Sequence, residues 1–370
     1  MVEETIGCGP LLIRADAGAE IGAGHAMRCL ALAEAWHKAG GKAAFLMAAT
    51  TSFVSEKIRA EGFEVVHVRA PRGSPEDARE TRKLCLDRQA RWLVLDGYAF
   101  DADYHQQVSL PACGLMIVDD LGNAGYRAAD IILNQNLHAG PSLYRQRKPQ
   151  ARLLLGPRYA LIRREFIATR GTAREISALA TRVLVTTGGG DPRNLLPTIV
   201  QAIAELTCPV EARVVVGGAV PHLKAVGGTC GSCVRIETGV HDLSGLMMWA
   251  DIAISTAGST CWELCCLGLP PVVIDIAENQ RPIAQQLARR GIAVHVPFDH
   301  ISAAGLAQAL GTLIISPERR KAMSQRGRRL VDGHGAERIV QAMQQVSPWT
   351  IAGLEKRVEP QPSDSLAARE

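Results

Sequence analysis

The chain has 370 residues, 47% of them hydrophobic and 21% charged, which is typical of a globular protein with a sizeable core. Lys and Arg number 41 against 37 Asp and Glu, and this small, scattered excess argues against a nucleic-acid-binding protein, although it suits an anionic small substrate. One core rarely serves so long a chain, so two domains are expected.

The sequence predicts a protein of a reducing cytoplasm. Met1 to Glu4 lack the basic start of a secretion signal, and no apolar run reaches the ~18–20 residues that span a membrane. Most of the ten cysteines lie in or beside apolar runs, where a free thiol packs as a small hydrophobic group. Cys230 and Cys233 form one CxxC without a second pair, so neither a zinc site nor a redox pair is expected.

The first half alternates strand-like and helix-like segments. Such units predict a parallel sheet with helices on both faces. The expected helices include Ala26–Ala39 and Ser52–Glu61. The expected strands are Leu11–Ile13, Ala43–Met47, Glu64–Val68, Trp92–Leu95, Leu115–Val118 and Ile131–Leu133.

Polar residues follow several of these strands, and they are predicted to share one cleft. Ligands of parallel sheets bind at the carboxyl ends of the strands. A single Asp after a strand is more often a turn or cap residue, so the prediction depends on how many strands end in polar residues. The polar strand ends are Asp16, Asp96, Asp119–Asp120 and Asn134–Asn136.

The loop after the first strand carries Gly22, Gly24 and His25, and the helix starts there. Unpaired N–H groups and the helix dipole favour an anion at such a junction, and a histidine can move a proton near neutral pH. The alternative is that the glycines only make the turn and His25 has no task. A dinucleotide site is not expected, because Lys42–Phe45 stands where the acidic residue of that fingerprint belongs.

The strand–helix alternation restarts after a transition from about residue 153 to 181. We predict a first domain over residues 1–175, a second over 176–350 and a polar, disordered tail over 351–370. The later helices are expected at Leu195–Leu206, Pro317–Gly333 and Ala336–Val346, among others. The expected strands are Arg182–Thr187, Ala212–Val216, Val234–Glu237, Ile252–Ser255 and Pro270–Ile274.

Two loops of the second half are predicted to bind a diphosphate. Thr187–Asp191 contains three consecutive glycines, and Ala257–Thr260 opens a helix. Glu263, one turn later, is placed to accept hydrogen bonds from a ribose diol. The alternative is a capping box in which Glu263 closes the helix start. Neither loop contains the Gly-Lys-Ser/Thr of a P-loop, so ATP hydrolysis is not expected.

These motifs resemble known families. Ser255–Gln280, STAGSTCWELCCLGLPPVVIDIAENQ, is similar to the nucleotide-sugar site of GT-B glycosyltransferases, among them the bacterial N-acetylglucosaminyltransferases of peptidoglycan synthesis. Arg14–Trp36, RADAGAEIGAGHAMRCLALAEAW, and Val185–Asn194, VTTGGGDPRN, resemble the hydrolases of UDP-2,4-diacetamido-2,4,6-trideoxy-β-L-altropyranose in pseudaminic acid synthesis. The resemblance, which covers about residues 11–340, implies an α/β protein of two facing Rossmann-like domains with the active site in the interdomain cleft.

The resemblance also implies a reaction: water attacks the anomeric carbon with inversion and UDP leaves, without metal or cofactor. His25 matches the family's catalytic histidine and Tyr98 its cleft tyrosine, whereas Asp16 and Arg28 match motif positions of unassigned role. The predicted catalytic residues are His25, Asp16 and Tyr98, and the predicted substrate-binding residues are Gly22, Gly24, Arg28, Gly189, Gly190, Gly258, Ser259, Thr260, Glu263, Asn279 and Gln280.

In the predicted mechanism a neutral His25 takes a proton from the water, and Asp16 or Asp96 orients the imidazole. Three alternatives stay open: a transferase with a sugar or lipid acceptor, a hydrolase of another UDP- or CMP-linked acetamido sugar, and a non-catalytic nucleotide-sugar-binding protein. The expected partner is the small UDP-sugar, with no nucleic acid and no membrane insertion. The oligomeric state is left open, a monomer included.

Overall fold

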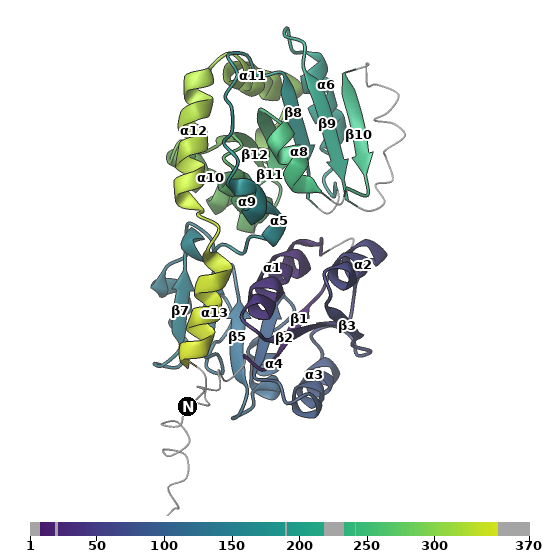
Figure 1. Cartoon of the computed structure of the whole chain (residues 1–370), viewed down its shortest axis with the longest axis vertical. Coiled ribbons are helices and arrows are strands. Elements are labelled where there is room, and N and C mark those ends of the chain that lie inside the picture. Colours follow the sequence, from purple (N-terminus) through teal and green to yellow (C-terminus); the bar gives the residue numbers. More distant parts are fainter. Residues whose placement is uncertain (1–7, 19–20, 189–190, 218–232, 241, 347–370) are drawn as a thin grey trace, which may run out of the picture.

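The computed structural model describes residues 8–18, 21–188, 191–217, 233–240 and 242–346. Within them the chain forms two parallel β-sheets, one in each half of the sequence, and helices cover both faces of each sheet (Figure 1). The predicted α/β class with two Rossmann-like sheets is therefore confirmed. The predicted diphosphate loop residues Gly189 and Gly190, Cys230 and the predicted disordered tail lie outside the described residues.

The first sheet has seven strands in the order β3-β2-β1-β4-β5-β6-β7, all parallel. Its last strand falls in the stretch expected to be a transition, because four residues at a sheet edge leave little periodic signal. The strands are β1 (Pro10–Ala15), β2 (Lys42–Met47), β3 (Glu64–His67), β4 (Trp92–Asp96), β5 (Gly114–Val118), β6 (Ile131–Asn134) and β7 (Arg152–Leu155).

The second sheet repeats this order with six strands, β10-β9-β8-β11-β12-β13, again all parallel. Its edge strand β13 was not expected from the sequence. The strands are β8 (Arg182–Thr186), β9 (Glu211–Val216), β10 (Val234–Thr238), β11 (Ile252–Thr256), β12 (Pro271–Asp275) and β13 (Val294–Pro297).

Helices follow most strands, and several pack on other helices instead of on a sheet, among them α5, α12 and α13. They are α1 (Gly24–Lys38), α2 (Ser52–Ala60), α3 (Pro75–Asp87), α4 (Ala102–Val108), α5 (Arg164–Arg170), α6 (Leu196–Ala204), α8 (Leu243–Trp249), α9 (Thr260–Leu267), α10 (Arg281–Arg289), α11 (Ala303–Ile314), α12 (Pro317–Leu330) and α13 (Gly335–Val346). Short 3₁₀ turns are η1 (Pro141–Tyr144), η2 (Pro157–Tyr159), η3 (Glu278–Gln280) and η4 (Phe298–His300).

The strand order places one crevice in each sheet. In the first sheet β1 lies between β2 and β4, and the helices after β1 and β4 pack on opposite faces, α1 in one core and α4 in the other. The loops after these two strands therefore diverge and leave a crevice at the carboxyl ends, the usual ligand site of such sheets. The second sheet has the same crevice between β8 and β11.

The last helix returns to the first half. Helix α13 packs against α1, and its side chains Ile339 and Met343 are fully buried in the core that contains β1 (Figure 1). The predicted division assigned this helix to the second domain, and its packing places it with the first. The sequence could not show this, because an amphipathic pattern predicts that one face of a helix is buried but not which surface it packs against. The boundaries near residues 175 and 350 remain predictions.

Two composition-based expectations can be compared with the described residues. No helix among them is both long and apolar enough to cross a membrane. The described cysteines are free, and most are buried, among them Cys29, Cys85, Cys261, Cys265 and Cys266. The expectation that these thiols pack as small hydrophobic groups is confirmed.

Replacement of Ile339 tests the docking of α13. Ile339→Ala removes a fully buried side chain from the core of the first half, so the free energy of unfolding should fall by about 2–4 kcal/mol. Urea titration measures it. Ile315→Ala is the matched control, because Ile315 is 65% exposed and its removal should cost less than about 0.5 kcal/mol. Equal losses in both variants would contradict the assignment of α13 to this core.

Candidate active site

His25 and Asp96 meet at the crevice of the first sheet. His25 is the second residue of α1, which follows β1, and Asp96 ends the neighbouring strand β4, where it is in register with Ala15. The Nδ1 atom of His25 lies 2.6 Å from Oδ1 of Asp96. Both side chains are buried, His25 to 9% exposure and Asp96 completely. Residues 71 positions apart thus meet because their strands are neighbours.

Arg28, one helical turn after His25, binds two buried carboxylates. Its Nε and one terminal nitrogen donate to the two oxygens of Asp96, each at 2.6 Å. Its other terminal nitrogen donates to Asp120 at 2.9 Å. The three residues are each less than 10% exposed. The predicted site residue Arg28 therefore neutralises part of the negative charge beneath His25.

The contact with Asp96 defines the tautomer of the neutral imidazole. A carboxylate only accepts, so Nδ1 of His25 carries a hydrogen and donates it to Asp96, which leaves Nε2 as the proton acceptor. Burial alone would raise the pKa of Asp96, but Arg28 and His25 hold it well below its usual range. Asp96 therefore stays ionised, fixes the tautomer of His25 and stabilises the imidazolium that forms when Nε2 takes a proton.

Tyr98 connects this cluster to the second half of the chain. Its hydroxyl donates to Asp120 at 3.3 Å and accepts from the side-chain amide of Asn279 at 2.8 Å. Its ring stands edge-on to His25, with the ring centroids 5.0 Å apart. Desolvation and the neighbouring Asp120 raise the pKa of Tyr98, so its hydroxyl keeps its proton at neutral pH. The predicted residues His25, Tyr98 and Asn279 are thus brought together.

Asp16, predicted to act beside His25, is engaged elsewhere. One of its oxygens accepts the backbone N–H groups of Ala48 at 2.7 Å and Ala49 at 3.0 Å, and it also lies 2.7 Å from the guanidinium of Arg14. Of the two carboxylates considered for orienting the imidazole, Asp96 is the one that contacts His25. Asp16 therefore does not orient the imidazole: its Oδ1 ties the end of β2 to the start of the glycine loop, and its catalytic role stays a prediction.

The start of α1 lies beside the start of α9 of the second half. A Cβ on Gly24 would lie 3.5 Å from the hydroxyl oxygen of Ser259, so the two helix starts approach closely. Neither helix has a side-chain cap: Ala23 and Ser259 make no capping hydrogen bond. Unpaired N–H groups and the positive ends of two helix dipoles therefore lie close together, and this combination attracts an anion.

The other predicted residues of the second half surround the start of α9. Thr260 is the first residue of the helix, and a Cβ on Gly258 would lie 3.9 Å from the amide nitrogen of Gln280. Gly22 lies in the glycine loop of the first half, and its backbone has a φ of 74°, which favours glycine. Except for Gly189 and Gly190, the predicted binding residues are all described, and those of the second half lie at the carboxyl ends of β11 and β12.

Glu263 does not form the capping box that the sequence left open. Its Oε1 accepts two hydrogen bonds from Arg163, from a terminal nitrogen at 3.0 Å and from Nε at 3.3 Å. Burial raises the pKa of Glu263, and Arg163 opposes that shift. The capping alternative is therefore not what the structure shows, and the contact of Glu263 with a ribose stays a prediction.

Three residues of this region had not been singled out as site residues. Asp120 and Asn136 belong to the polar strand ends, and they are joined by a hydrogen bond of 2.8 Å, so the signal was present. Asp119, next to Asp120, instead accepts a hydrogen bond from the hydroxyl of Tyr126 at 2.7 Å. The alternation of strands and helices in the sequence does not distinguish these two aspartates. Arg163 lies 100 residues from Glu263, and no sequence pattern connects them.

Residues 163–165 also connect the start of α5 to the first half. The backbone N–H of Arg164 donates to Glu34 of α1 at 2.8 Å. The side chain of Glu165 lies 3.3 Å from Lys57 of α2, which also pairs with Glu61 at 2.9 Å. Helix α5 itself packs on α8 and α9 of the second half. This segment therefore holds the helix that carries His25 next to the helix that carries Glu263.

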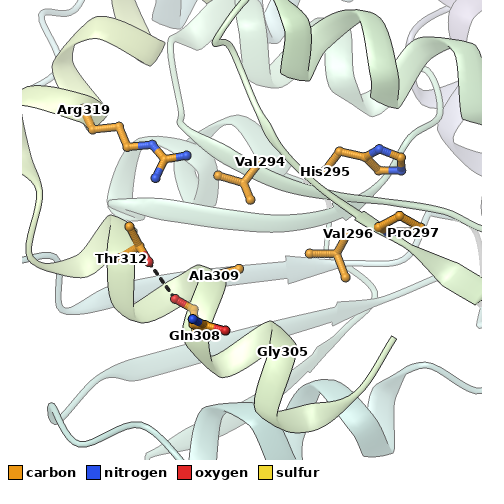
Figure 2. Close-up of a pocket in the computed structure, with 9 residues that line it drawn as sticks. All are labelled: Val294, His295, Val296, Pro297, Gly305, Gln308, Ala309, Thr312 and Arg319. Atoms are coloured by element: carbon orange, nitrogen blue, oxygen red, sulfur yellow. Dashed lines mark hydrogen bonds between the residues drawn. The ribbon is translucent and has the colours of Figure 1, made fainter. Parts of the chain in front are cut away.

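A separate hollow lies at the edge of the second sheet, between β13 and α11 (Figure 2). It has a volume of about 330 Å³, Val294 and Val296 line it, and the side chain of Arg319 points toward it. None of the predicted site residues lines this hollow. Among the described residues no group of three or more His, Cys, Asp or Glu side chains is arranged to hold a metal ion.

Comparison with known proteins agrees with this architecture. Residues 226–345 match the model of the glycosyltransferase family 28 C-terminal domain. The chain is 26% identical over 348 residues to the spore coat polysaccharide biosynthesis protein SpsG of Bacillus subtilis, which covers 90% of this chain and 97% of that protein. It is 35% identical over 109 residues to the UDP-N-acetylglucosamine–N-acetylmuramyl-(pentapeptide) pyrophosphoryl-undecaprenol N-acetylglucosamine transferase of Xanthomonas campestris, 28% of this chain and 26% of that enzyme.

Solved structures resemble the whole chain. MurG of Acinetobacter baumannii matches with a TM-score of 0.62 and 16% identity, over 91% of this chain and 99% of its own. The glycosyltransferase VinC, solved with dTDP, matches with a TM-score of 0.62 and 14% identity, over 92% of this chain and 100% of its own. This chain has the GT-B fold.

The buried Glu34 predicts a dependence of stability on pH. Burial raises its pKa from 4.5 to about 7, against the opposing N–H of Arg164, and the nearby Glu61 and Glu165 add to the rise. Between these two values the folded state binds more protons than the unfolded state, so stability falls as pH rises. Relative to Glu34→Gln, the wild type should lose on the order of 2–3 kcal/mol of unfolding free energy between pH 4.5 and 8.

Urea titrations at pH 4.5 and pH 8 measure this difference. Glu56→Gln is the matched control, because Glu56 is an exposed glutamate on α2 and its replacement should leave the pH dependence of the wild type unchanged. The same pH dependence in Glu34→Gln as in the wild type would show that Glu34 does not carry it.

Proposed function

We propose that this protein is an enzyme that acts on a nucleotide-activated sugar and breaks the bond between its anomeric carbon and the diphosphate. The observation that carries the proposal is the pairing of His25 with Asp96 at the point where the start of α1 faces the uncapped start of α9. In this proposal the proton acceptor and the site for the leaving diphosphate lie on either side of the contact between these two helix starts. The GT-B fold and the matched family 28 domain support this reading.

The residues give each step a chemical basis. Nε2 of His25 takes the proton of the attacking O–H group, whose oxygen forms the bond to the anomeric carbon, and the diphosphate leaves with the electron pair of the broken bond. Base catalysis of this kind contributes typically about 10²–10⁴-fold. Asp96 stabilises the resulting imidazolium, and Arg28 keeps Asp96 ionised. The N–H groups of Ser259 and Thr260 stabilise the charge on the diphosphate.

The attacking group is either water or the hydroxyl of an acceptor. The resemblance of Gly22–Arg28 to the pseudaminic acid pathway hydrolases favours water and a UDP-linked 2,4-diacetamido sugar. The matched family 28 domain and the transferase relatives support transfer to an acceptor better than hydrolysis. Both reactions need the same base and the same leaving-group site. The free, mostly buried cysteines suit a cytoplasmic enzyme in either case.

The deciding experiment is UDP release from UDP-2,4-diacetamido-2,4,6-trideoxy-β-L-altropyranose in oxygen-18 water, with EDTA and without acceptor. Release with the label on the sugar carbon supports a hydrolase with the predicted attack. Label on the phosphate contradicts attack at the anomeric carbon. Tight UDP binding without release favours a transferase, which the addition of candidate acceptors then tests. If UDP does not bind at all, the proposed function is wrong.

Replacement of His25 tests its role as the base. His25→Asn should lower turnover by at least about 100-fold and leave UDP affinity within a few-fold, because the base acts on the attacking oxygen and not on the nucleotide. Steady-state kinetics and calorimetric UDP binding measure the two effects. His37→Asn, an exposed histidine at the far end of α1, should keep full turnover. Near-normal turnover of His25→Asn would remove His25 from the mechanism.

A further inference from the structure

Arg163 holds Glu263 by one oxygen and leaves the other available. A terminal nitrogen and Nε of Arg163 both donate to Oε1 of Glu263, at 3.0 and 3.3 Å. The Glu263 side chain is 14% exposed, so it is not fully covered. An ionised carboxylate has acceptor capacity on both oxygens, and one oxygen engaged by a guanidinium leaves the second for a ligand. The contact therefore orients the carboxylate without consuming it.

The guanidinium is itself held in place from several sides. Its remaining terminal nitrogen donates to Glu165 at 2.6 Å, and the guanidinium carbon lies 4.8 Å from the ring centroid of Phe166. Arg163 is only 8% exposed. A planar group with fixed donors on two edges and an aromatic ring on its face has one orientation, which a lysine ammonium does not reproduce.

The same guanidinium links the two halves of the chain. Glu263 lies on α9 of the second half, whereas Glu165 is 3.3 Å from Lys57 on α2 of the first half. An unbroken series of ion pairs therefore runs from α9 through Arg163 to α2. Movement of one half relative to the other would break a buried contact in this series, and leaving a buried charge without its partner is unfavourable.

We propose that Arg163 is the positioning residue of the nucleotide site, which orients Glu263 toward the ribose hydroxyls and fixes α9 to the first half. The inference rests on the proposed function, in which Glu263 binds the ribose. Arg163 acts through Glu263 and does not touch the reacting atoms. Its loss should therefore weaken the recognition of ribose hydroxyls and leave the recognition of the base and the diphosphate largely unchanged.

The test compares the Kd of UDP with that of 2′,3′-dideoxy-UDP by calorimetry. The wild type should bind UDP about tenfold more tightly or better, since two hydrogen bonds to a carboxylate are lost in the dideoxy ligand. Arg163→Gln and Glu263→Gln should both bring this ratio close to one while the Kd of the dideoxy ligand changes less than about threefold. Arg164→Gln is the control, because its exposed side chain pairs with Glu61 instead.

A pH series separates positioning from a merely structural role. Without Arg163, the burial of Glu263 favours its protonated form, with the like charge of Glu165 acting in the same direction. In Arg163→Gln the ratio should therefore recover partly as pH rises from 6 to 9, whereas the wild-type ratio stays constant. Both ligands carry the same diphosphate, so its ionisation cancels in the ratio. A ratio that stays near one at every pH would contradict the electrostatic part of the inference.

The outcomes distinguish the two proposals. If the wild type binds neither ligand, the proposed function fails; if it binds both equally well, the proposed role of Glu263 fails and the proposed function does not. If the wild type and Glu263→Gln behave as expected but Arg163→Gln keeps the full ratio, Arg163 is not the positioning residue. Should Arg163→Gln fail to fold, Arg163→Lys carries the test: a reduced ratio supports the inference and a wild-type ratio overturns it.

Discussion

A single buried cation holds the first half of the site together. Arg28 binds Asp96 and Asp120 at once, and without it two buried carboxylates would face each other uncompensated. Because Arg28 keeps Asp96 ionised, Asp96 can fix the tautomer of His25, and Asp120 can accept the hydroxyl of Tyr98. One guanidinium, placed one helical turn after His25, thus connects the two carboxylates that contact His25 and Tyr98.

Arg163 has a corresponding position in the other half. It binds Glu263 beside the start of α9, and through Glu165 it reaches α2. A buried arginine therefore arranges a carboxylate on each side of the candidate site, Asp96 for the imidazole and Glu263, in our proposal, for the ribose. Two parallel sheets with the same strand order place both carboxylates near the gap between the halves, since the crevice of each sheet opens at the carboxyl ends of its strands.

Polar strand ends were the most informative sequence signal of the site. Asp96, Asp120 and Asn136 were expected to share a cleft because parallel strands end at the same edge, and hydrogen bonds now connect them through Arg28 and directly. The position after a strand does not show which of these polar residues contact the site. Asp16 and Asp119 also follow strands, yet Asp16 binds the end of β2 and Asp119 binds Tyr126, because the direction of a side chain depends on the turn that follows the strand.

The sequence by itself determined the two parallel sheets and the His25 loop, because alternating strands and helices and a glycine-rich turn are local patterns. Only the tertiary structure decided what depends on contacts between distant residues. Asp96 and not Asp16 contacts His25, Arg163 pairs with Glu263 across 100 residues, and α13 packs in the first half. Local patterns carry no information about these partners, since strand order and helix docking bring them together.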